Sequence, residues 1–162
     1  MTMARNRPFP SIPVLAALAA LSAAGCSAPV TGGGLPVDAL DQAIGKVVGD
    51  PATCVLLAER STGKVVYRYG AAFNCVRGAP VCDRPGFMSA AQALALASTP
   101  GGRGASCPSS PSDATRMVGW AEGRVSSPTR DLIYSAMMEG DTALPGHEIG
   151  SRLEGAFRKA GL

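Results

Sequence analysis

Cysteines are the residues of this sequence whose spacing says most about chemistry. Cys26 stands alone near the start. The other four fall in one later stretch: Cys54, Cys75, Cys82 and Cys107. An even number of thiols in one stretch fits two disulfides in an oxidising compartment. A metal site is disfavoured, because no C-x-x-C pair exists and the only histidine, His147, lies far along the chain. The sequence therefore predicts a disulfide framework, with no metal and no cofactor.

The pairing of these four cysteines is not fixed by the sequence, since four cysteines allow three pairings. We favour Cys75–Cys82 with Cys54–Cys107. The first bond closes the loop CVRGAPVC, and the second ties an early strand to a later Cys-Pro loop. The alternative is Cys54–Cys75 with Cys82–Cys107.

Few side chains of this sequence lie in a motif that is typical of a catalytic residue. Ser89 is the best candidate nucleophile, but Gln92 follows it by three positions, which is the pattern of a helix capping box. His147 stands in Pro-Gly-His-Glu and no Gly-x-Ser-x-Gly motif is present, so a serine triad has no sequence support. Glu139 and Asp141 flank a glycine and are interpreted as solvated turn residues. We predict no catalytic residue.

Trp120 is the candidate binding residue, because it is the only tryptophan and lies in a predicted strand. A tryptophan can line a ligand groove. The other interpretation is a core position with its N–H hydrogen-bonded.

The N-terminal segment has the pattern of a secretory signal. Arg5 and Arg7 precede an apolar run over 12–24, and small residues then lead to Cys26. The run is as long as a signal-peptide hydrophobic region and too short to span a bilayer. The sequence therefore predicts a signal peptide over 1–25.

The residues before Cys26 specify the kind of signal. Ala23-Ala24-Gly25-Cys26 resembles the bacterial lipobox, with Ala23 where leucine is usual. The resemblance implies cleavage before Cys26, a diacylglycerol on its thiol and an acyl chain such as palmitate on the new N-terminus. Several acyl chains anchor a protein stably to a membrane. Ser27, in place of aspartate, implies the outer membrane, facing the periplasm, if the cell is Gram-negative. The alternative is an ordinary secretory signal in which Cys26 has no role.

A tether and one domain follow the signal. Residues 26–37 are rich in glycine and proline and predict a flexible link, and 38–162 is a comfortable length for a single domain. The chain has fifteen basic and twelve acidic residues, and Arg5 and Arg7 leave with the signal. The nearly neutral remainder has no basic run, so nucleic acid is not an expected partner.

The hydrophobic spacing predicts alternating helices and hairpins. Asp38 is the expected cap of a first helix. Helices are predicted over 39–48 and 89–98 and from Pro145 onward. Strands are predicted over 53–59, 64–69, 116–125 and 131–138. The segments 74–86 and 99–113 are predicted to be loops. This order predicts an α+β domain, with an antiparallel sheet of about four strands and the N- and C-terminal helices packed on it.

Parts of this order resemble the serine penicillin-recognising enzymes, the β-lactamases and transpeptidases. The segment LLAERSTGKVVYRYG (56–70) is similar to their opening hairpin, and VGWAEGRV and DLIYSAMMEGD to their closing strands. The resemblance implies a Ser-x-x-Lys nucleophile motif, but Gln92 replaces the lysine after Ser89. The family's Lys-Thr-Gly strand motif is also missing, because the similar letters at 61–64 fall in a hairpin turn.

Together these patterns favour a non-catalytic cell-envelope lipoprotein that acts as a binding or structural module. Its expected contacts are the membrane, through Cys26, and an envelope protein or peptidoglycan. The alternative is a degenerate serine hydrolase that uses Ser89 on cell-wall peptides or small amides. A roadblock- or profilin-like scaffold, which shares the mixed order of helices and hairpins, is a third option.

Overall fold

The computed structural model describes residues 34–97 and 102–162. The predicted signal and the lipidation site at Cys26 lie outside the described residues. The helices in the described part are α1 (Val37–Val48), α2 (Ala72–Val76), α3 (Ala90–Leu96) and α4 (Gly146–Lys159). The strands are β1 (Cys54–Glu59), β2 (Val65–Tyr69), β3 (Ala79–Pro80), β4 (Phe87–Met88), β5 (Arg103–Ser110), β6 (Asp113–Ser126) and β7 (Asp131–Gly140).

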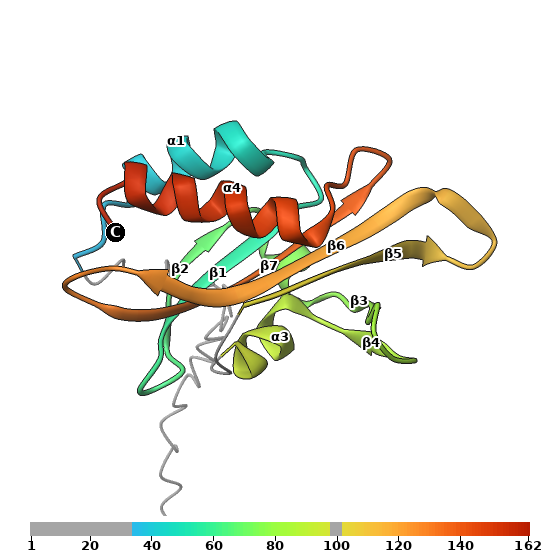
Figure 1. Cartoon of the computed structure of the whole chain (residues 1–162), viewed down its shortest axis with the longest axis horizontal. Coiled ribbons are helices and arrows are strands. Elements are labelled where there is room, and N and C mark those ends of the chain that lie inside the picture. The colour runs from blue at the N-terminus through green and yellow to red at the C-terminus, as the bar shows by residue number, and fades with distance from the viewer. Residues whose placement is uncertain (1–33, 98–101) are drawn as a thin grey trace, which may run out of the picture.

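The main sheet is antiparallel, with the strand order β2-β1-β7-β6-β5 in the described part of the chain. Helices α1 and α4 lie together on one face, and α3 and the β3–β4 hairpin lie on the other (Figure 1). The chain is thus a single small α+β domain, as predicted, with its N- and C-terminal helices on the same face. The predicted hairpins β1–β2 and β6–β7 are both confirmed.

The sheet has one strand more than predicted, because β5 occupies part of the predicted 99–113 loop. Its glycines and prolines do not prevent pairing, since β5 is an edge strand and an edge tolerates proline. The glycines also allow α4 to approach. A Cβ on Gly104 would lie 2.6 Å from the backbone nitrogen of His147, and one on Gly146 would lie 2.1 Å from the carbonyl oxygen of Trp120. A residue with a side chain at either position would push α4 off the sheet.

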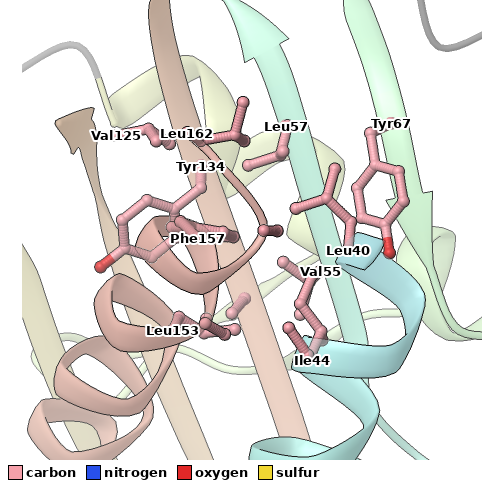
Figure 2. Packing of buried hydrophobic residues seen from close by; sticks show 14 of the residues in the cluster. Leu40, Ile44, Val55, Leu57, Tyr67, Val125, Tyr134, Leu153, Phe157 and Leu162 are labelled. Carbon is pink, nitrogen blue, oxygen red and sulfur yellow. The ribbon is translucent and has the colours of Figure 1, made fainter. Parts of the chain in front are cut away.

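The larger core lies between the sheet and the two terminal helices (Figure 2). Val55 and Leu57 of β1 point toward α1 and α4, in line with the two-residue period of a strand. The predicted apolar stripe of α4 is confirmed: Ile149, Leu153, Ala156, Phe157 and Ala160 are all buried. The Phe157 ring packs edge-on against Tyr134, with ring centroids 5.3 Å apart.

A second core lies on the opposite face of the sheet, under α2, α3 and the β3–β4 hairpin. It is formed by residues that alternate with those of the first core, among them Leu56, Ile133 and Met137. The prediction that 131–138 is a central strand covered on both faces is therefore confirmed. The predicted 74–86 loop is wrong in part, because it contains most of α2 and strand β3.

The start of α1 differs slightly from the prediction. The helix begins at Val37 with Pro36 in the N-cap position, and no side chain caps it. Asp38 lies in the first turn instead, where its negative charge still interacts favourably with the helix dipole.

The two disulfides follow the alternative pairing, Cys54–Cys75 and Cys82–Cys107. The favoured pairing was wrong because of the strand order. Cys54 on β1 and Cys107 on β5 are three strand spacings apart, or about 14 Å. A disulfide needs Cα atoms within about 7 Å, and the observed pairs lie at 5.2 and 5.3 Å. One bond ties α2 to β1, and the other ties the β3–β4 hairpin to β5.

Candidate functional site

Ser89, the candidate nucleophile, is the N-cap of α3. Its hydroxyl oxygen accepts a hydrogen bond from the Gln92 backbone N–H at 3.2 Å. The Ser89 backbone N–H in turn donates to the Gln92 side-chain oxygen at 2.9 Å. This is the reciprocal capping box that the sequence predicted. The Ser89 side chain is buried, and its hydroxyl satisfies a free N–H of the first turn.

The first turn of α3 sits directly on the central strands. The Ser135 hydroxyl, from β7, donates to the Ala90 carbonyl oxygen at 2.6 Å, and Ser135 is fully buried. This hydrogen bond holds the N-terminus of α3 against strand β7. It also places Ser89 over the same face that carries Trp120 and Glu122.

Glu122 is a residue of this face that the sequence analysis missed. It pairs across the sheet with Ser135 on one side and Arg103 on the other. Its side chain is only 3% exposed, and its Oε2 accepts no hydrogen bond from the described residues. Burial raises the pKa of the Glu122 carboxyl, and the positive charge of Arg103 opposes that shift. Arg103 itself forms an ion pair with Asp83.

The raised pKa of Glu122 predicts a pH dependence of stability. A carboxyl with a folded-state pKa above its usual 4.5 favours folding in its protonated form, and this contribution is lost as the pH rises through the folded-state pKa. We therefore expect Glu122→Gln to raise the melting temperature relative to wild type more at pH 8 than at pH 4.5. Thermal unfolding at both pH values measures this. The exposed Glu154→Gln is the control, and an equal shift of the Glu122 variant at both pH values would contradict the prediction.

A groove of about 310 Å³ opens beside the start of α3, between that helix and the β3–β4 hairpin. Its walls include Val81, Arg84, Phe87, Met88, Gln92 and Leu96. Phe87 is 75% exposed, an unusual environment for a large aromatic side chain. Gln92 therefore belongs both to the capping box and to the groove wall. We call this surface the Phe87 groove.

Trp120, the predicted binding residue, lies in the core. It is 3% exposed and its indole N–H donates to the Pro80 carbonyl oxygen at 2.8 Å. The interpretation as a groove residue is therefore wrong, and the alternative interpretation of Trp120 as a hydrogen-bonded core residue is confirmed. Its role is to hold the β3–β4 hairpin, one wall of the Phe87 groove, against the sheet.

His147 is exposed at the start of α4, as predicted. Because α4 covers one face of the sheet and α3 the other, the structure does not bring His147 together with Ser89 (Figure 1). Glu139 and Asp141 each have a basic partner. Glu139 pairs with Arg77, and Asp141 lies 3.6 Å from Arg116. These contacts give both carboxylates structural partners at the end of β7.

No protein-family model, curated protein or solved structure matches this chain. Within 34–97 and 102–162, no helix is both long enough and apolar enough to cross a bilayer. The same residues contain no group of three or more His, Cys, Asp or Glu side chains arranged to hold a metal ion.

Proposed function

We propose that this chain is a non-catalytic binding module of the bacterial cell envelope, held at the membrane by acyl chains on Cys26. The observation that carries the non-catalytic part is the capping box of α3. A nucleophilic serine needs a base within hydrogen-bond reach. The Ser89 hydroxyl instead meets a backbone N–H, and its side-chain partner Gln92 is an amide that does not accept a proton at neutral pH.

The Phe87 groove is the proposed binding surface. Phe87 and Leu96 offer apolar area to solvent, and Arg84, whose guanidinium lies 3.4 Å from the Asp83 carboxylate, adds a basic side chain at the same groove. This combination suits a protein segment or cell-wall peptide that presents an apolar side chain next to a carboxylate. The Cys82–Cys107 disulfide and the hydrogen bond from Trp120 to Pro80 hold the β3–β4 hairpin against the sheet. They therefore keep the Phe87 groove in a fixed shape before binding.

The absence of a nucleophile is tested with covalent probes. Purified protein is incubated with a fluorescent penicillin and with a fluorescent fluorophosphonate, and adducts are read after denaturing electrophoresis. We expect no stoichiometric adduct with wild type. Ser89→Ala should lower the free energy of unfolding by about 1 kcal/mol through loss of the cap, and Ser89→Asp should retain most of the stability.

One observation favours the serine hydrolase as a second candidate. Glu122 is a buried carboxyl on the same face of the sheet, opposite Ser135, which bonds the residue after Ser89. A nucleophilic serine needs a general base, and in a serine hydrolase Glu122 would be the buried carboxyl of this face that serves as that base. A wild-type adduct that disappears in Ser89→Ala would establish this second candidate and overturn the first.

A further inference from the structure

One end of the domain is where the predicted tether joins it. Gly34 is the first described residue, and a Cβ added to it would lie 3.0 Å from the Arg130 guanidinium. Arg130 belongs to the β6–β7 turn, and one open depression is lined by both this turn and the β1–β2 turn, including Ser61. The C-terminal end of α4 lies beside the same turn, where Ser126 and Arg158 share a small depression. We call this the tether end, and it lies at the left of Figure 1.

The tether end carries six basic side chains, all exposed except the half-buried Arg130. They are Arg60, Lys64, Arg124, Arg130, Arg158 and Lys159. Lys64, Arg124, Arg158 and Lys159 are exposed, and none of these four forms an ion pair with another described residue.

The acidic side chains of the same end are fewer. They are Asp38, Asp41, Glu59, Asp131 and Glu154. Asp131 forms an ion pair with Arg60 at 2.6 Å, and Glu59 accepts a hydrogen bond from Thr62 at 3.2 Å. The surplus positive charge therefore lies mainly on Lys64, Arg124, Arg158 and Lys159, which form no ion pair with another described residue.

The tether restricts how far this end can move from the bilayer. Seven residues lie between Cys26 and Gly34, so the two residues are eight Cα–Cα steps apart. A chain of that length reaches at most about 28 Å when fully extended. With Cys26 acylated, the tether end is therefore the part of the domain held nearest to the lipid headgroups.

We propose that the tether end docks on the anionic phospholipid headgroups of the bilayer that holds the Cys26 anchor. The proposal rests on the proposed function, because it requires that anchor. Each basic side chain near an anionic surface adds to the attraction, within a screening distance of about 10 Å. Docking in this way would keep the β3–β4 hairpin, which lies away from the tether end in Figure 1, open to a partner, together with the Phe87 groove that the hairpin lines.

The lysines of this chain provide the test. The sequence contains three: Lys64 and Lys159 at the tether end, and Lys46 in the last turn of α1, away from it. The lipidated mature protein is placed in vesicles of phosphatidylcholine alone, or of phosphatidylcholine with about 30% phosphatidylglycerol. An uncharged amine-reactive ester is applied briefly, and labelling of each lysine is measured by peptide mass spectrometry.

We expect labelling of Lys64 and Lys159 to fall about threefold or more in the anionic vesicles, while Lys46 changes little. The Arg124→Gln/Arg158→Gln variant should regain labelling of both lysines. The Arg116→Gln/Arg152→Gln variant, which loses the same charge elsewhere, should behave as wild type.

This experiment distinguishes a failure of the Cys26 anchor from a failure of docking alone. If the intact mass shows no acyl chains on Cys26, the anchor fails and the docking proposal fails with it. If the acyl chains are present but Lys64 and Lys159 are labelled equally in both vesicles, or all three lysines are protected alike, only the docking proposal is overturned.

Discussion

Phe157→Ala is expected to lower the free energy of unfolding by about 3–5 kcal/mol. Phe157 is 1% exposed and fills the space between α4 and the sheet, with its ring against Tyr134. Removing the ring leaves a cavity that the surrounding side chains cannot fill, since α4 is held against β5 and β6 by the close contacts of Gly104 and Gly146. Urea-induced unfolding followed by circular dichroism measures the loss.

Phe87→Ala is the matched control for this substitution. It removes the same ring from a position that is 75% exposed, so the free energy of unfolding should change by no more than about 0.5 kcal/mol. Partner binding, measured by recovery of envelope proteins on the immobilised variant, should fall. An equal loss of stability in both variants would show that the Phe87 groove is part of the core and would remove the basis for the binding surface.

Removal of either disulfide has the next largest expected effect. Cys54→Ala/Cys75→Ala and Cys82→Ala/Cys107→Ala should each lower the free energy of unfolding by about 2–4 kcal/mol, because the two loops have similar lengths, with sequence separations of 21 and 25 residues. Loss of the second bond should also weaken partner binding, since it frees the hairpin that forms one wall of the Phe87 groove.

The pairing itself can be read from a tryptic digest made without reduction. Basic residues separate all four cysteines, and the Arg84–Pro85 bond resists trypsin. The structure predicts that peptide 47–60 is joined to 69–77, and 78–103 to 104–116. Joining of 69–77 to 78–103 would instead indicate the pairing that the sequence favoured. Labelling of two or more cysteines by an alkylating reagent before reduction would contradict both.

Elements whose pattern is local were predictable from the sequence. The apolar stripe of α4 and the two β-rich runs that form the β1–β2 hairpin depend only on nearby residues, and both form as expected. The capping box of α3 was equally predictable from the sequence. Ser89 and Gln92 are three residues apart, and the side chain of each accepts a hydrogen bond from the backbone N–H of the other within one turn.

The features that the sequence did not reveal depend on distant neighbours. Strand β5 has the composition of a loop, but it pairs with the edge of β6. Its Gly104 has no side chain, which lets the start of α4 pack directly on the strand. The disulfide pairing follows from the strand order, which separates Cys54 from Cys107. Glu122 was overlooked because it stands in an apolar run, where its burial was visible only once β7 and α3 were in place.

The most direct measurement of the central claim is the intact mass of the mature protein, isolated from envelopes after exposure of the cells to a penicillin. Our account predicts a chain that begins at Cys26, carries the mass of the diacylglycerol and the N-terminal acyl chain, and has no penicillin adduct. A Cys26→Ser chain should lack the lipid mass and leave the membrane fraction. An unmodified mature N-terminus at another residue, or a stoichiometric adduct on Ser89, would contradict the account of a lipid-anchored, non-catalytic module.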